Sequence, residues 1–146
     1  MIDKCLELTA YDAQYRIPWI VFDRDQVKDF DDIIAEAISK GIQVGWSNPC
    51  FEIWMYAYFG SMPVIHDSWT CCSEFGRIYE NKIGQKYSKA DMQMYAKICN
   101  AGDEEKAIKI AQQKLEQCIR EGKIKPSQMW PATTVHELVG KIRGKI

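Results

Sequence analysis

A short apolar run, residues 17–22, ends on two acids, Asp23 and Asp25. The run is β-branched and aromatic without polar alternation, which is typical of a strand covered on both faces in a parallel sheet. Because side chains alternate along a strand, we expect both acids to point to one side and Arg24 to the other. The pattern predicts an acidic pair, Asp23 and Asp25, at the carboxyl end of a central strand.

Apolar residues then recur at three- and four-residue spacing, which predicts a helix over residues 27–40. Asp25 is a suitable N-cap for this helix and Gly41 a suitable end. Residues 42–46 form a second short apolar run, which predicts a second strand. Strand, helix and strand with tight connections predict a right-handed βαβ unit with parallel strands.

The segment after the second strand is apolar nearly all round, which predicts a buried helix over residues 49–59. Asn48 as N-cap and Pro49 at the first helical position are strong signals for its start. Glu52 is the only charged residue of this helix. A buried carboxylate needs a partner, and three remain open: a basic side chain, backbone N–H groups, or a metal shared with the acidic pair.

The rest of the chain has helical periodicity. We predict helices over residues 74–86, 88–99 and 103–121, a last helix capped by Thr133 or Thr134 and ending near residue 142, and a helix or its tail over residues 1–15. This pattern predicts an α/β fold, with a small parallel sheet flanked by helices and a mainly helical C-terminal half. We expect a single domain over residues 1–146, with the acidic site in a βαβ core at 1–60 and a helical part at 61–146. His66, in a predicted loop, and His136, on the last helix, are interpreted as ordinary histidines.

Nineteen basic and twenty acidic residues give a net charge of −1, which supplies no overall drive toward nucleic acid or a membrane. The six cysteines contain no C-x-x-C pair and no spacing typical of a zinc site. Without a signal peptide or an apolar run long enough to span a bilayer, we expect free thiols and a cytoplasmic protein that does not bind membranes.

The acidic pair predicts a metal site. Ligands in open parallel sheets collect beyond the carboxyl ends of the strands, and two carboxylates there repel each other unless a cation or a proton lies between them. Oxygen ligands favour Mg²⁺ or Mn²⁺. The alternative is that Asp25 only caps the following helix while Asp23 is solvated.

Three blocks of this sequence, taken in order, resemble the RloB-like family: Val21-Phe-Asp-Arg-Asp25, Ser47-Asn-Pro-Cys-Phe-Glu-Ile-Trp54 and Pro131-Ala-Thr-Thr-Val-His-Glu-Leu138. RloB-like proteins resemble the Toprim class, and they occur near restriction–modification and phage-defence genes in bacteria. Toprim domains hold Mg²⁺ for phosphodiester chemistry with an Asp-x-Asp at a strand end and a glutamate on an earlier strand. The resemblance therefore implies a Mg²⁺-dependent, nuclease-like enzyme.

By this resemblance, Asp23 and Asp25 are the expected metal ligands and catalytic residues, with Mg²⁺ or Mn²⁺ as the cofactor. We expect Glu52 to complete the metal shell or to act as a base, and Ser47 and Asn48 to bind substrate, Asn48 together with the N–H groups of its helix. The expected partners are DNA or RNA, other defence-system proteins and, for a homo-oligomer, further copies of the chain.

The sequence departs from the family in one respect: we expect the N-terminal strand with its Glu-Gly-x-Thr-Glu-like motif to be missing, which leaves Glu7 as the only upstream glutamate. A haloacid-dehalogenase-like phosphatase is an alternative, with Asp23 as nucleophile, Asp25 as acid/base and Ser47 in its second motif. Gly102-Asp103-Glu104-Glu105 is then a poor last motif, because it lies between predicted helices. A second alternative is a non-catalytic interaction subunit.

Overall fold

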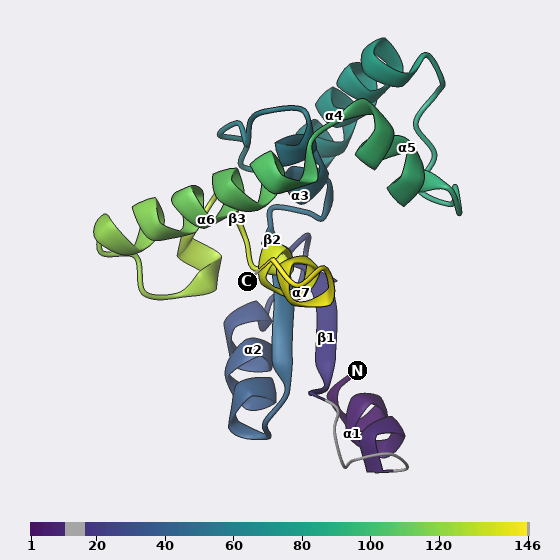
Figure 1. The fold of residues 1–146 in the computed structure, drawn as a ribbon. Helices are drawn as coiled ribbons and strands as arrows, with labels where there is room; N and C mark the ends of the chain where they lie inside the picture. Colours follow the sequence, from purple (N-terminus) through teal and green to yellow (C-terminus); the bar gives the residue numbers. More distant parts are fainter. Residues whose placement is uncertain (11–16, 146) are drawn as a thin grey trace.

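The predicted βαβ unit forms the sheet end of the molecule (Figure 1). In this computed structural model, which describes residues 1–10 and 17–145, β1 (Trp19–Asp23) runs parallel to β2 (Gln43–Asn48), with Asp23 opposite Ser47. The α/β class and the parallel pair are confirmed. The helix predicted over residues 1–15 is α1 (Ile2–Ala10), and residues 11–15 lie outside the described part.

Helix α2 (Phe30–Ser39) connects the two strands and begins three residues later than predicted. Residues 24–29 form turns, so Asp25 is not the N-cap, and the position before the helix is Asp29. Phe30 is the first core contact of the helix: its ring meets those of Phe22 and Trp46 edge-on at centroid distances of 5.3 and 6.0 Å. The apolar periodicity placed the helix correctly, but Val27 lies in the turn that precedes it.

The sheet has a third strand, β3 (Ala132–Thr133), which pairs antiparallel with β2 and makes the sheet mixed rather than wholly parallel as predicted. The hydroxyl groups of this segment explain the pairing. Thr134 Oγ1 donates to Val44 O and accepts from the Trp46 N–H, and Thr133 Oγ1 donates to Trp46 O. The two threonines therefore dock the C-terminal segment onto β2, which local sequence patterns do not reveal.

Helices cover both faces of β2 (Figure 1). Trp46 packs against α2, whereas a Cβ added at the neighbouring residue Gly45 would touch Val135 of α7 (Val135–Ile142). Because adjacent residues of a strand point to opposite faces, α2 and α7 lie on opposite sides of the sheet. The sheet core is formed by apolar residues that include Ile20, Ile34, Ile42 and Val44.

A second core surrounds α3 (Glu52–Tyr58), whose seven residues are all buried, as predicted. α4 (Ser68–Ile83) and α6 (Glu104–Arg120) pack against it, and α5 (Met94–Ala101) precedes α6; a short 3₁₀ turn, η1 (Pro126–Gln128), follows. The α4 helix begins six residues before the predicted start, because Asp67 caps it by accepting a bond from the Thr70 N–H. Within the described residues, no helix combines the length and hydropathy needed to cross a bilayer.

Candidate functional site

A cavity lies at the carboxyl ends of β1 and β2, where the sequence predicts a site. Its volume is about 600 Å³. Both members of the acidic pair line it, together with side chains from the β2–α3 connection, the start of α4 and the α4–α5 connection. The lining residues are Asp23, Arg24, Asp25, Gln26, Asn48, Pro49, Cys50, His66, Asp67, Ser68, Trp69, Cys72 and Lys89.

Asp23 is the last residue of β1, and its carboxylate is partly buried. Its Oδ2 accepts a hydrogen bond from the backbone N–H of Phe51 at 3.1 Å. Burial raises the pKa of Asp23, and the nearby charges of Asp25 and Glu52 raise it further, against lowering by the Phe51 N–H and by Lys89. The environment of Asp23 thus favours a proton or a cation.

Asp25 reaches the same cavity by a different route from the one predicted. The strand ends at Asp23, so strand alternation does not place Asp25. Its backbone has a φ of +38°, a left-handed conformation that aspartate tolerates better than most residues. Its N–H donates to Pro49 O at 2.9 Å, and the Arg24 N–H donates to Ser47 O at 2.9 Å. These bonds fix the turn against the end of β2.

The Arg24 side chain is not paired with Asp23 or Asp25. Its guanidinium donates to the carbonyl oxygen of Ser127 at 2.7 Å, which links the β1–α2 turn to η1. Asp25 is exposed, and both acids line a cavity large enough for a small ligand. The arrangement therefore leaves room for a cation beside the two carboxylates.

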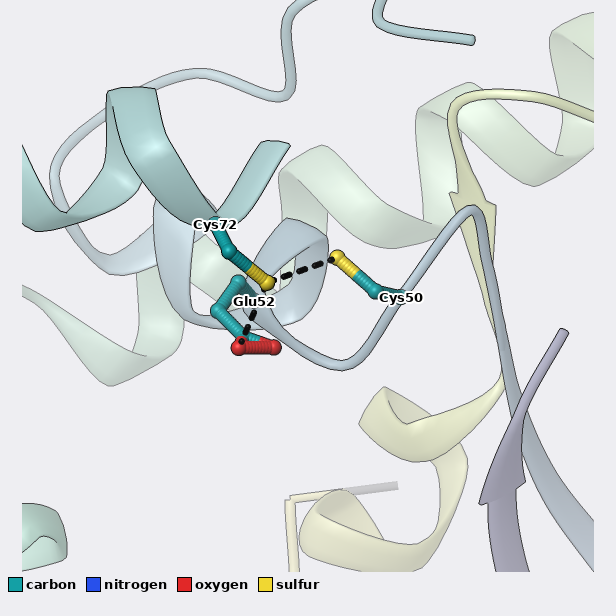
Figure 2. A group of neighbouring side chains, drawn as sticks. All are labelled: Cys50, Glu52 and Cys72. Atoms are coloured by element: carbon teal, nitrogen blue, oxygen red, sulfur yellow. Dashed lines mark hydrogen bonds between the residues drawn. The ribbon is translucent and has the colours of Figure 1, made fainter. Parts of the chain in front are cut away.

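Glu52 lies in the first turn of α3 and is only 3% exposed (Figure 2). Its Oε2 accepts hydrogen bonds from the Tyr87 hydroxyl at 3.2 Å and the Cys72 thiol at 3.3 Å, and lies 3.5 Å from Lys89 Nζ. The sequence left three possible partners for Glu52, and the structure provides one of them, the basic side chain of Lys89. Burial and the Glu52 charge both raise the pKa of Tyr87.

The two thiols nearest Glu52 are also partly or fully buried. The sulfurs of Cys50 and Cys72 lie 3.9 Å apart (Figure 2). Contact with the Cys71 thiol and burial raise the pKa of Cys50, and burial raises that of Cys72 to about 12. Without a bound cation, both therefore stay protonated at neutral pH.

A family model with the description RloB-like protein matches residues 2–142, nearly the whole chain. The chain belongs to the RloB-like protein family. No curated protein and no solved structure matches it. In this RloB-like chain, Asp23 and Asp25 line the cavity at one end of the sheet. Glu52 is close to them, because the Phe51 N–H that bonds to Asp23 belongs to the residue before it.

Asn48 does not cap α3 as predicted, because it is the last residue of β2 and the helix begins four residues later. Its side chain is buried, and its Nδ2 donates to the carbonyl oxygens of Met129 at 2.8 Å and Pro126 at 3.1 Å, with Ser127 O at 3.4 Å. Ser47 is fully buried, with its hydroxyl 2.8 Å from that of Thr133. Both residues hold the C-terminal segment against β2, although Asn48 also borders the cavity.

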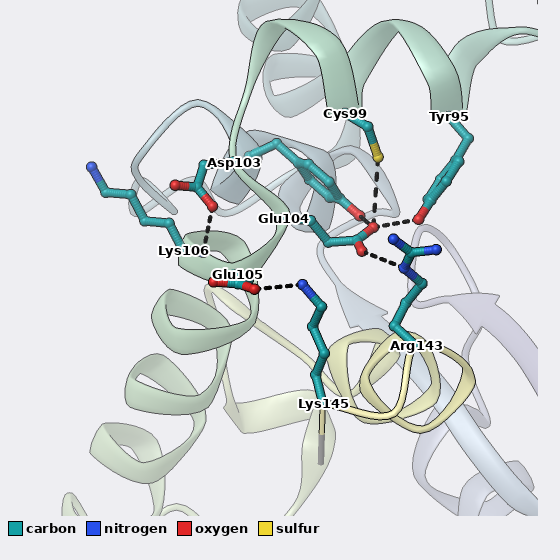
Figure 3. Close-up of polar contacts among 9 residues, drawn as sticks. Tyr95, Cys99, Asp103, Glu104, Glu105, Lys106, Arg143 and Lys145 are labelled. Carbon is teal, nitrogen blue, oxygen red and sulfur yellow. Dashed lines mark hydrogen bonds and ion pairs between the residues drawn. The ribbon is translucent and has the colours of Figure 1, made fainter.

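Three residues around the site were not singled out from the sequence: Cys72, Tyr87 and Lys89 all contact Glu52. They come from α4 and the segment that follows it, and no local motif marks them. The acidic residues 103–105, which the phosphatase alternative would need as its last motif, form a helix cap, hydrogen bonds and ion pairs with other parts of the chain (Figure 3). Asp103 caps α6, Glu104 bonds with Tyr58, Tyr95, Cys99 and Arg143, and Glu105 pairs with Lys145.

His66 lies in a loop as predicted, lines the cavity and packs edge-on against Trp130 at a centroid distance of 5.4 Å. His136 is fully buried, with its Nε2 2.8 Å from Gln112 Oε1 and its Nδ1 without a hydrogen-bond partner among the described residues. Burial lowers the pKa of His136 from 6.5 to about 4. This imidazole is therefore neutral at pH 7 in the folded protein.

Acid is expected to destabilise the protein through His136. Below pH 6.5 the unfolded chain gains a proton at this residue, whereas the folded chain does so only near pH 4, so stability falls as pH decreases through that window. From pH 7 to pH 5 this contribution is about 2 kcal/mol. Urea unfolding at both pH values would show a smaller loss in His136→Gln than in the wild type, whereas His66→Gln would keep the wild-type loss. Equal losses in all three proteins would contradict this assignment.

Proposed function

We propose that this RloB-like protein is a Toprim-type enzyme that cleaves phosphodiester bonds with the help of Mg²⁺ or Mn²⁺. The observation that carries the proposal is the acidic pair, whose two carboxylates line one cavity at the carboxyl ends of two parallel strands. Ligands of open parallel sheets collect at such a place. A setting in bacterial phage defence or restriction follows from the family resemblance alone.

The donor set fits a hard divalent cation. Asp23 and Asp25 offer carboxylate oxygens, the ligands that Mg²⁺ and Mn²⁺ prefer, and Arg24 is engaged with Ser127 rather than with either acid. A bound Mg²⁺ would stabilise charge on a phosphodiester oxygen and lower the pKa of a water molecule.

The residues of the chain supply orientation and charge around that cation. The Phe51 N–H holds Oδ2 of Asp23, which fixes the carboxylate. Lys89, whose side chain is 70% exposed at the cavity wall, can attract a phosphate while it pairs with Glu52. Trp69 also borders the cavity and is 81% exposed, so its ring is available for stacking on a nucleobase. These features favour a nucleic acid as the substrate.

The test is cleavage of a phosphodiester panel by the wild-type chain, with parallel measurement of Mn²⁺ binding by electron paramagnetic resonance. Single- and double-stranded DNA, RNA and tRNA would each be incubated with Mg²⁺, with Mn²⁺ and with EDTA. We expect cleavage only with the metals, and Mn²⁺ binding that Mg²⁺ displaces. Absence of Mn²⁺ binding at millimolar concentration, or equal cleavage in EDTA, would contradict the proposal.

The same protein preparation can distinguish the phosphatase alternative from the Toprim-type enzyme. A haloacid-dehalogenase-like enzyme forms an aspartyl phosphate, which beryllium fluoride mimics on Asp23 when Mg²⁺ is present. A Toprim-type site has no such intermediate, so we expect no beryllofluoride adduct by ¹⁹F NMR and unchanged cleavage. A stable adduct would favour the phosphatase. Mn²⁺ binding without cleavage or adduct would leave a metal-binding interaction subunit.

A further inference from the structure

Three potential metal ligands converge beside the acidic pair without belonging to it. Cys50 comes from the β2–α3 connection, Glu52 from the first turn of α3 and Cys72 from α4 (Figure 2). One ligand atom from each residue lies within 4.8 Å of the other two. The two sulfurs are 3.9 Å apart, and Cys72 Sγ is 3.3 Å from Glu52 Oε2.

We propose that Cys50, Glu52 and Cys72 bind a Zn²⁺ ion. Tetrahedral zinc with Zn–S bonds of about 2.3 Å and a Zn–O bond of about 2.0 Å holds two sulfurs about 3.8 Å apart and sulfur and oxygen about 3.5 Å apart. The sulfur–sulfur and sulfur–oxygen distances in the structure agree with these edges within a few tenths of an ångström. The Cys50 sulfur and a carboxylate oxygen of Glu52 also lie within 4.8 Å of each other. Binding therefore requires side-chain movements that bring all three ligand atoms to zinc distances, and the loss of the two thiol protons.

The surroundings balance the charge of such a site. Two thiolates and one carboxylate carry three negative charges, which Zn²⁺ and the Lys89 ammonium together neutralise. Lys89 Nζ and the Tyr87 hydroxyl both contact Oε2 of Glu52. Outer partners of this kind fix the orientation of a ligating carboxylate. Glu52 thus has a role in a site of its own, in place of the shared magnesium shell.

The ligand count indicates which kind of zinc site this is. Structural zinc sites have four protein ligands, whereas three protein ligands and one open position are typical of sites that bind water or substrate. Cys50 and Cys72 line the same cavity as the acidic pair, so water or a ligand in that cavity can reach the site. The sulfur ligands also separate the two sites by ion, because thiolates favour zinc and carboxylates favour magnesium.

Cobalt provides the spectroscopic test, since Co²⁺ occupies zinc sites and reports thiolate ligands by charge-transfer absorption. Metal-free, reduced protein is expected to bind one equivalent of Co²⁺ with this absorption, and Zn²⁺ is expected to abolish it. Loss of an outer-sphere partner typically weakens metal binding 10–100-fold. Cys50→Ser and Cys72→Ser should each weaken Zn²⁺ binding by at least that much, because each removes a direct ligand. Cys118 is a buried thiol of α6. Cys118→Ser is therefore the matched control and should keep the wild-type spectrum.

A measurement on the wild type covers the case in which a variant fails to fold. X-ray absorption at the zinc edge should show two sulfurs at about 2.3 Å and lighter atoms in the remaining positions. A zinc shell without sulfur, or a folded wild type without the cobalt absorption, would overturn the zinc site. Wild-type affinity and undiminished absorption per bound cobalt in both serine variants would do the same, because each variant lacks one thiolate ligand.

The zinc site and the proposed phosphodiesterase can fail separately. Asp23→Asn is expected to keep the cobalt absorption, because its carboxylate is not one of the three ligands. Cobalt binding without Mg²⁺-dependent cleavage would support the zinc site and leave the phosphodiesterase unsupported. Cleavage that survives Cys72→Ser, together with loss of cobalt binding, would show that the two sites work independently.

Discussion

Asp23→Asn is expected to lower Mg²⁺-dependent phosphodiester cleavage by about 100-fold or more, the scale for removing one preorganised electrostatic group from an active site. The amide keeps the size of the side chain, and its oxygen can still accept the Phe51 N–H bond. What it loses is the negative charge that holds the cation. Single-turnover cleavage at saturating substrate, over a Mg²⁺ series, would measure the effect.

Stability distinguishes this role from a structural one. Burial and the nearby carboxylates raise the pKa of Asp23 in the folded state. Its ionised form therefore opposes folding at neutral pH, and Asp23→Asn should unfold at the same or a higher urea concentration. Asp32→Asn, at an exposed position in the first turn of α2, should leave cleavage unchanged. Loss of activity with loss of stability would assign Asp23 a structural role.

The β1–α2–β2 unit could be predicted because each of its signals is local. The apolar runs of the strands, the helical spacing and Gly41 all act within a few residues, and Gly41 has the expected positive φ of 77°. The helix start was wrong because Asp25 offered good capping chemistry in the sequence. In the structure the chain first has to turn across the end of β2, and this turn occupies residues 24–29.

The third strand of the sheet, β3, could not be predicted, because its stabilising contacts join residues far apart in the sequence. Thr134 occupies the N-cap position of α7, as predicted, but its hydroxyl makes no cap bond there. The hydroxyls of Thr133 and Thr134 bond to the backbone of β2 almost ninety residues away. Nothing local shows that a threonine at a helix cap also bonds to a distant strand.

Part of the candidate site could be predicted, because its signal in the sequence is also local. Asp23 and Asp25 follow a strand whose end is visible in the sequence, and the structure places both at one cavity. The partners of Glu52 were not predictable, since Cys72 and Lys89 are brought in by the packing of α4 against α3. The packing of the second core determines their arrangement, and no sequence motif does.

Asn48→Asp is expected to destabilise the fold by about 3–5 kcal/mol, the range for a buried charge left without a partner. The substitution keeps the shape of the side chain but removes the Nδ2 donor, which faces the carbonyl oxygens of Pro126, Ser127 and Met129. The introduced carboxylate would lie against these oxygens at the buried end of β2. Urea unfolding at pH 7 would measure the loss.

Lowering the pH should restore part of that stability, because a protonated carboxyl can again donate a hydrogen bond. The folded-state pKa of the introduced group would lie above its unfolded value of about 3.9. The penalty should therefore be largest above the folded pKa and shrink as pH falls toward 3.9. Gln43→Glu makes the same amide-to-acid change at the exposed start of β2 and is expected to cost less than about 0.5 kcal/mol. Equal costs for the two substitutions would show that Asn48 does not hold the C-terminal segment, and would return it to the substrate-binding role predicted from the sequence.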